Sequence, residues 1–159
     1  MQEPSRARTQ PFDPPGGGLG YALMQAANAW RAELAATLAP VSVTPPQFFV
    51  LSALLHARGR QRPAPNQKEL ADRTGIDVNT ISQVIRGLER RDLVRRETHP
   101  EDSRALAPQL TDSGLELARY CTKEARALNR LYFADIDPES LLAALKHLAA
   151  ASRRRRGQR

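Results

Sequence analysis

The sequence is short of several features that mark particular classes of protein. Its 159 residues include one cysteine, Cys121, so no disulfide can form within the chain. Aromatic residues make up only 5%, and no segment approaches the roughly 18 uncharged apolar residues of a membrane-spanning helix. The polar first ten residues lack the apolar stretch of a secretory signal. We therefore expect a cytoplasmic protein with a reduced thiol and no membrane partner.

Signatures of catalysis and of metal binding are missing as well. The sequence contains no glycine-rich phosphate loop and no nucleophile elbow, so we expect neither enzyme activity nor a cofactor. The three histidines, His56, His99 and His147, share no metal-ligand spacing with Cys121. Cys121 falls on the apolar face of a predicted helix, which favours an inert buried thiol over an oxidant sensor.

The chain does have an excess of positive charge. It holds 24 basic and 17 acidic side chains, for a net charge of +7. Five arginines lie within residues 153–159, so the other 152 residues, with 19 basic and 17 acidic side chains, carry only +2. A basic balance favours an anionic partner such as nucleic acid. The tail is equally compatible with a nonspecific grip on phosphates and with a disordered terminus.

The chain divides into an arm, one domain and a tail. Residues 1–18 are rich in proline and glycine, which is typical of a disordered arm. Residues 19–152 have a mainly helical pattern and suit a single domain, and residues 153–159 form the basic tail. The predicted elements are helices over 21–39 and 45–58, a short helix between Asn66 and Gly75, a helix between Asp77 and Leu88, strands over 93–98 and 105–110 joined by a polar turn, and helices from Thr111 and from Pro138.

Capping residues locate a helix-turn-helix in the middle of the chain. Asn66 followed by Glu69 is typical of a capping box, and Gly75 permits a tight turn. Asp77 is the next N-cap candidate, and an amphipathic helix follows it. A helix-turn-helix followed directly by a β-hairpin is a winged helix, so we expect a mainly α (α+β) fold. The apolar stripe of the second helix consists of Ile81, Val84, Ile85 and Leu88.

The residues from Gln67 onward resemble the MarR family (multiple antibiotic resistance regulators). The helix-turn-helix half is shared by many regulators, whereas the wing turn followed by Leu-Thr-x-x-Gly is more specific. The match covers residues 44–118, and helix order alone extends it to 19–43 and 119–151. The residues that carry it are Gln67 to Ile76, Thr80-Ile81-Ser82, Leu88-Glu89-Arg90-Arg91, Leu93-Val94, Asp102-Ser103-Arg104, Leu110-Thr111 and Gly114.

The resemblance implies a homodimer whose helices over 19–39 and 111–152 intertwine, joined to a DNA-reading part over residues 44–110. It implies that two recognition helices enter successive major grooves of double-stranded DNA at a palindromic operator, with wings in the flanking minor grooves. It also implies repression that a small-molecule effector or an oxidant relieves. Two alternatives stay open: a ligand-independent architectural or replication protein, and a winged-helix module that binds protein.

The sequence departs from the family pattern at three positions. Asp92 stands where a glycine usually separates the recognition helix from the wing, and Gln83 occupies a position that is often basic. Gly87 lies in the middle of a helix, where it costs about 1 kcal/mol relative to alanine.

The polar face of the second helix supplies the candidate DNA-reading side chains. Asparagine and glutamine pair bidentately with adenine, and arginine suits guanine. Serine and threonine bind phosphates or bases, and Arg90 is a candidate for a phosphate contact. The alternative is a solvated polar face, with a charged rim at Arg90. The predicted contacts from this helix are Asn79, Thr80, Ser82, Gln83, Arg86 and Arg90.

On the wing, the candidates are Arg104 and Asp102. A guanidinium that enters a narrow minor groove gains from its negative potential, and Asp102 is placed to hold Arg104 by a charge-assisted contact. The alternative is a surface ion pair worth about 0–1 kcal/mol. Residues 66–104 contain eight basic and eight acidic side chains, so binding must depend on where these charges lie.

A ligand pocket between the dimer helices and the DNA-reading part is a further expectation from the resemblance. Aromatic residues at helical spacing are also common in ordinary cores, and this alternative stays open. The candidates in the matching region are Tyr21, Trp30, Arg31, Phe48 and Phe49.

Overall fold

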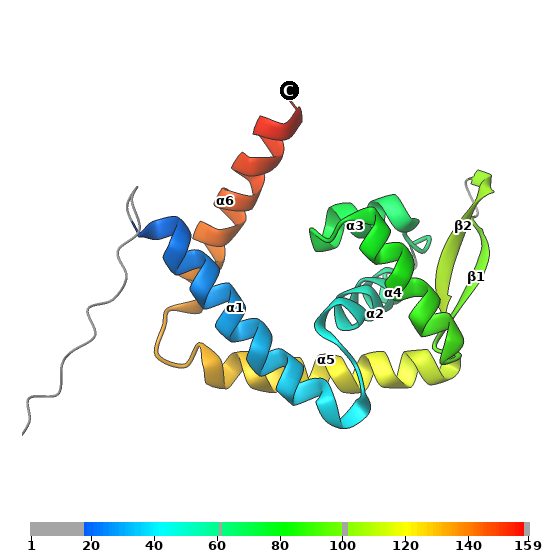
Figure 1. The fold of residues 1–159 in the computed structure, drawn as a ribbon, viewed down its shortest axis with the longest axis horizontal. Helices are drawn as coiled ribbons and strands as arrows, with labels where there is room; N and C mark the ends of the chain where they lie inside the picture. The colour runs from blue at the N-terminus through cyan, green and yellow to red at the C-terminus, as the bar shows by residue number, and fades with distance from the viewer. Residues whose placement is uncertain (1–17, 61, 100–101, 158–159) are drawn as a thin grey trace, which may run out of the picture.

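The computed structural model describes residues 18–60, 62–99 and 102–157, with the backbone alone for 98–99, 102–106 and 152–157. Its described part is mainly helical with one two-stranded antiparallel sheet, which confirms the expected fold class (Figure 1). The elements are α1 (Leu19–Leu38), the short 3-10 helix η1 (Ala39–Val41), α2 (Pro45–Gly59), α3 (Gln67–Thr74), α4 (Val78–Arg90), β1 (Val94–His99), β2 (Asp102–Leu110), α5 (Asp112–Tyr132) and α6 (Pro138–Gly157).

The predicted N-caps are present. Asn66 Oδ1 accepts from the backbone N–H of Glu69 at 3.0 Å, and Glu69 Oε2 accepts from the N–H of Asn66 at 2.8 Å, which completes the capping box. Thr44 and Gln47 form a second capping box at the start of α2. Thr111 caps α5 by accepting from the N–H of Gly114. Local sequence signals therefore set where these helices begin.

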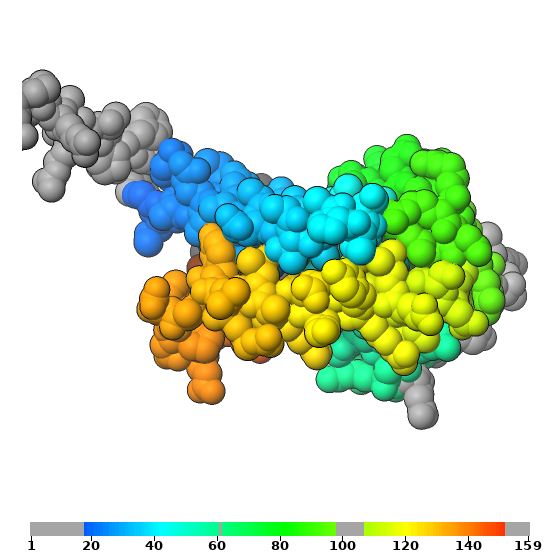
Figure 2. All heavy atoms as spheres, turned by 90° about the horizontal axis from the view of Figure 1, so that it is seen from below, coloured from blue at the N-terminus to red at the C-terminus, as the bar shows by residue number. Residues whose placement is uncertain are grey.

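The helices are arranged around α2. This helix packs against α3 and α4 and also against α5, while the hairpin of β1 and β2 stands beside α4 (Figure 1). Helices α1 and α5 lie side by side (Figures 1 and 2). Helix α6 leaves the end of α5 and points away from the other elements.

The hydrophobic core lies inside the α2–α4 unit and along its contact with α5. Leu51 and Leu54 of α2 are buried, and Leu34 and Leu38 reach the core from the second half of α1. From α5, Cys121 is buried, and this burial raises the pKa of its thiol. A thiol that is buried and protonated is a poor nucleophile.

No single helix in the described ranges has both the length and the apolar composition to cross a membrane. Helix α1 with η1 passes that test only jointly with α2, and these two are bent by 79°.

The hairpin is longer than the sequence predicted. Residues 99–104 were expected to form a polar turn, but His99 ends β1 and Asp102 begins β2, paired across a register irregularity. The ladder continues because backbone hydrogen bonds between strands do not require apolar side chains. Residues 100–101 lie outside the described part of the chain. Pro108 lies in β2, and both strands of this two-stranded sheet are edges, where the missing N–H of proline is tolerated.

The C-terminal boundary also differs from the prediction. A separate tail was expected from residue 153, but α6 continues to Gly157. Arginine is a good helix former, and cations are favoured near a helix C-terminus. Residues 1–17 of the expected arm over 1–18, and the last two residues of the chain, lie outside the described part.

Candidate nucleic-acid interface

Helix α4 is held against the protein by the predicted apolar stripe. Ile81, Ile85 and Leu88 are buried, and Val84 is half-buried. Gly75 has φ of 72°, so the left-handed turn between α3 and α4 suits the residue that lacks a Cβ. The fixed inner face determines which side chains of α4 point outward.

Three of the predicted contacts form an open polar face. Asn79, Gln83 and Arg86 are exposed, and none of their side chains makes a hydrogen bond or ion pair with another described residue. They are spaced at i, i+4 and i+7, which places them on one side of the helix. Ser82 is half-buried beside them. The structure thus brings these side chains together with their polar groups available to a partner.

Thr80, also a predicted DNA contact, is hydrogen-bonded to the N-cap residue of α4. Its hydroxyl donates to Asp77 Oδ2, and its backbone N–H donates to Asp77 Oδ1 at 2.9 Å. These hydrogen bonds, the one from the Thr80 side chain first, hold the pKa of the Asp77 carboxyl below its usual value. Asp77 therefore stays ionised at the N-terminus of α4, where a negative charge is favoured by the helix dipole.

The arginines at the hairpin entrance differ in whether their side chains have a partner within the described protein. Arg91 donates to the backbone oxygens of Ser42 at 2.6 Å and Val41 at 3.2 Å, which ties the end of α4 to the segment between α1 and α2. Arg90 is exposed and has no such partner among the described residues. No local sequence signal indicated this anchoring role of Arg91, because its partners lie about fifty residues earlier. Two neighbours form ion pairs at 2.7 Å, Arg95 with Glu97 and Arg96 with Glu89.

The base of the hairpin is fixed to α5 by a close backbone contact. A Cβ on Gly114 would lie 1.8 Å from the backbone oxygen of Leu93, so only glycine fits. Thr111 Oγ1 donates to the backbone oxygen of Asp92 at 2.7 Å. Asp92 itself has φ of 53°. This is the left-handed region, which glycine adopts without steric cost and which aspartate tolerates better than most other residues. This contact explains the Leu-Thr-x-x-Gly spacing.

The wing candidates lie on strand β2. Asp102 begins the strand and Arg104 is two residues further on. Their side chains are outside the described part of the structure, so their roles stay predictions.

The five candidates for a ligand pocket do not form one group. Trp30, Phe48 and Phe49 cluster, with ring centroids 6.2 Å apart for Trp30–Phe49 and 5.7 Å for Phe48–Phe49. Tyr21 lies nine residues before Trp30, about 13 Å along the helix, and bonds to Gln25.

Burial separates the clustered residues further. Phe48 belongs to the core, whereas Phe49 is half-buried and lines a hollow of about 430 Å³ between α2 and α3. Arg31 is exposed and bonds to Asn28. Trp30 Nε1 donates to Asn129 Oδ1 at 3.0 Å, which joins α1 to α5. The hollow next to Phe49 is shared with Ser52, Ala53, His56, Arg73 and Thr74.

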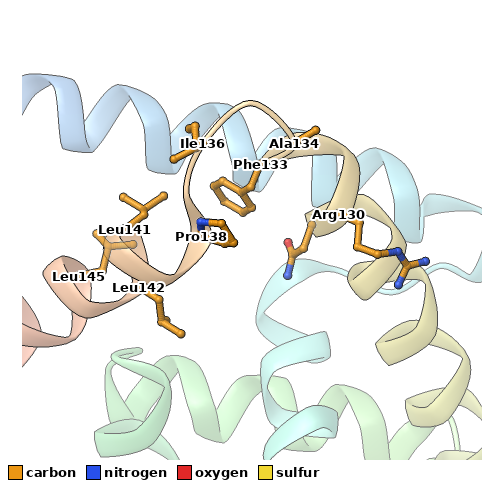
Figure 3. Close-up of a pocket in the computed structure, with 9 residues that line it drawn as sticks. Arg130, Phe133, Ala134, Ile136, Pro138, Leu141, Leu142 and Leu145 are labelled. Atoms are coloured by element: carbon orange, nitrogen blue, oxygen red, sulfur yellow. The ribbon is translucent and has the colours of Figure 1, made fainter.

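An apolar groove of about 650 Å³ lies where α5 turns into α6 (Figure 3). Phe133 and Pro138 form its floor in this view, and Leu141, Leu142 and Leu145 line it from α6. Leu142 is 52% exposed and Leu148, further along α6, is 53% exposed. Such a concentration of exposed leucines is unusual on a surface that faces only water.

Residues 41–105 match the model of the MarR family. The HTH-type transcriptional repressor Rv2887 of Mycobacterium tuberculosis (strain ATCC 25618 / H37Rv) is 31% identical over 109 residues, which cover 69% of this chain and 75% of that protein. The uncharacterized HTH-type transcriptional regulator YdcH of Bacillus subtilis (strain 168) is 26% identical over 138 residues, 86% of this chain and 93% of that protein.

Solved structures agree with these matches. AbsC, a MarR family transcriptional regulator from Streptomyces coelicolor, has a TM-score of 0.72 at 27% identity and covers 87% of this chain and 92% of its own. BpsR of Bordetella bronchiseptica, whose DNA binding is described as regulated by 6-hydroxynicotinic acid, has a TM-score of 0.70 at 27% identity, with 84% and 92% covered.

Proposed function

The chain belongs to the MarR family and is a DNA-binding transcriptional regulator, and from this premise we propose that it acts as a homodimeric repressor on a palindromic operator. The observation that carries the proposal is the outer face of α4. Its Asn79, Gln83 and Arg86 are exposed and unpaired among the described residues, on a helix whose other face is held in the core. A polar face fixed in this way is suited to a rigid partner.

The chemistry of this face fits the edges of base pairs. The major groove is about 12 Å wide and admits one helix with its side chains. Gln83 and Asn79 offer the amide geometry that pairs with adenine, and Arg86 offers two parallel donors for guanine. Arg90 at the end of α4 is placed for a phosphate. We further propose that Arg104, on strand β2, enters the adjacent minor groove, with Asp102 beside it.

The second copy would be held by the terminal helices. Exposed apolar side chains gather on the first half of α1, the end of α5 and α6, including Leu23, Met24, Leu131 and Leu142. A symmetric pair that buried these residues would present two α4 helices, one for each half-site. Half-sites of such dimers lie about 34–36 Å apart, one helical turn of DNA.

The effector would occupy the hollow beside Phe49. The aromatic ring of a ligand in this hollow can stack on Phe49. The guanidinium of Arg73, on the opposite helix, can bind a carboxylate of the same ligand. We therefore propose an aromatic carboxylic acid as the ligand class. 6-Hydroxynicotinic acid is a suitable first probe. Arg73→Gln should abolish its effect on DNA binding, while Arg31→Gln, outside the hollow, should leave it intact.

The experiment that tests the main proposal is selection of bound fragments from random duplex DNA. We expect an inverted repeat whose half-sites are centred about one helical turn apart. The Gln83→Ala variant should lose preference at one base position in each half-site, since a bidentate pair is worth about 1–3 kcal/mol of discrimination. Arg104→Ala should bind the same sequence several-fold more weakly. Enrichment without a repeat would favour an architectural protein, and an unchanged Gln83→Ala profile would refute the assigned base contact.

A further inference from the structure

A second hollow, separate from the one beside Phe49, lies along α5 where this helix meets α2. It measures about 390 Å³ and is lined by α5 together with Leu55 of α2. Helix α5 carries four basic residues, and all four line this hollow. The three acidic residues of the helix, Asp112, Glu116 and Glu124, are not among its lining residues. The cations are Arg119, Lys123, Arg126 and Arg130.

The spacing of these residues places them on one stripe of the helix. They follow one another at intervals of four, three and four residues, so each cation has another as its neighbour one turn away. The stripe is about 16 Å long from Arg119 to Arg130. Like charges at such spacing repel and destabilise a helix. Within the described ranges the ion pairs are Arg95–Glu97 and Arg96–Glu89, so no cation of the stripe is held in an ion pair there.

A concave surface lined by charges of one sign concentrates ions of the opposite sign. Arginine binds phosphate through two parallel N–H groups, and three of the four cations are arginines. Leu55 and Ala127 add an apolar wall to the same hollow. We infer that this hollow, which we name the α5 cation pocket, binds a small ligand with clustered phosphates joined to an apolar group, such as a nucleoside diphosphate.

The position of the pocket separates it from the DNA-reading face. Its lining comes from α2 and α5, and none comes from α3, α4 or the hairpin. Figure 1 shows α5 on the opposite side of α2 from α3 and α4. DNA read by α4 therefore does not account for the stripe.

The test is titration calorimetry on the intact protein with three probes, ADP, inorganic pyrophosphate and adenosine, at about 50 mM salt to limit screening. ADP and pyrophosphate should bind and adenosine should not, because the cations supply most of the attraction. The double variant R119Q/R126Q should weaken ADP binding at least about 10-fold, since it removes two charge-assisted contacts. Lys123→Glu should weaken it further by placing a carboxylate among the phosphates.

The matched control is R58Q/R60Q. It removes the same charge from exposed arginines that do not line the pocket, so its ADP affinity should equal that of the wild type. An equal loss in both double variants would reduce the effect to net charge and overturn the pocket. The inference also fails if neither phosphate probe binds at millimolar concentration. A changed dimer dissociation constant in R119Q/R126Q, with ADP binding unaffected, would assign the stripe to assembly instead.

Discussion

Two regions of this chain differ in how much of their apolar surface is buried within the chain itself. The winged-helix unit, residues 45–110, buries its large apolar side chains internally, with Leu51, Leu70, Ile81 and Leu88 all inaccessible. The terminal helices, by which we mean residues 19–33 of α1 together with α6, contain no buried residue whose side chain is described. Several of their leucines are exposed, among them Leu23, Leu142 and Leu148, and Figure 3 shows the groove that Leu142 lines on α6.

The difference indicates which region can bury its apolar side chains within a single chain and which region needs another protein surface. The winged-helix unit has capped helices, and α5 and the second half of α1 complete its core within the same chain, so it needs no partner chain to define its shape. The terminal helices have apolar faces that only another protein surface can cover. A second copy is the occupant proposed above, because it also supplies the second reading helix that a palindrome requires.

The strongest way to break the packing of the winged-helix unit against α5 is Gly114→Ala. The added methyl would lie 1.8 Å from the backbone oxygen of Leu93, so α5 and the hairpin must move apart. We expect a loss of about 3 kcal/mol or more in the free energy of unfolding, at the upper end for overpacking. Urea denaturation followed by circular dichroism measures this loss. A stability equal to that of the wild type would contradict the close contact.

Leu142→Glu should break the proposed contact between the terminal helices of two copies and spare the winged-helix unit. A carboxylate buried without a partner costs roughly 3 kcal/mol, which corresponds to at least a 100-fold weaker dimer. Sedimentation equilibrium measures the dissociation constant, and helix content should stay unchanged. Ala143→Glu places the same side chain at an exposed α6 position outside the groove and is the control. Equal dissociation of both variants would remove the groove from the interface.

Gly87→Ala is expected to stabilise α4, the helix proposed to read DNA, and so provides a second alanine substitution to compare with Gly114→Ala. A Cβ there would meet Gln47 Nε2 at 3.7 Å and Arg90 Nη2 at 3.9 Å, which are ordinary contacts. Alanine should therefore raise the free energy of unfolding by about 0.5–1 kcal/mol. The same substitution thus has opposite signs at Gly87 and Gly114. A destabilised Gly87→Ala protein would show that α4 packs more tightly than described.

The smallest effect concerns pH and the cap of α4. The folded pKa of Asp77 is lowered by its hydrogen bonds with Thr80, so the stability it contributes is present above the unfolded pKa of about 3.9 and is lost as pH falls through the folded value. Asparagine also caps helices but does not titrate in this range. The difference in unfolding free energy between wild type and Asp77→Asn should therefore change below pH 4 and stay constant from pH 5 to 8. If the difference in unfolding free energy between the two proteins does not change with pH, the ionised Asp77 carboxyl does not have the proposed role.

Much of the fold follows from local sequence signals. Asn66 and Asp77 were predicted as N-caps from residue type and spacing, and each accepts the expected backbone hydrogen bond. The outward face of α4 followed from its apolar stripe. Such predictions succeed because caps and helical periodicity act over a few residues.

Other features depend on contacts between distant segments, which a single sequence does not reveal. Arg91 bonds to residues about fifty positions earlier, and Gly114 meets Leu93 across the base of the hairpin. The pocket prediction grouped Tyr21 with Trp30 because both are aromatic residues of one helix, yet about 13 Å of helix separates them. The extension of α6 to Gly157 was missed because a run of like charges also suits a mobile end.

The most direct test of the account changes the distance between the two half-sites of the selected operator. Five inserted base pairs rotate one half-site by about half a turn, so a rigid dimer can reach only one of them. Wild-type affinity should fall to that of a single half-site, whereas Leu142→Glu should bind both operators equally. If the wild type binds the two spacings equally tightly, the proposed link between the terminal helices and DNA reading is wrong.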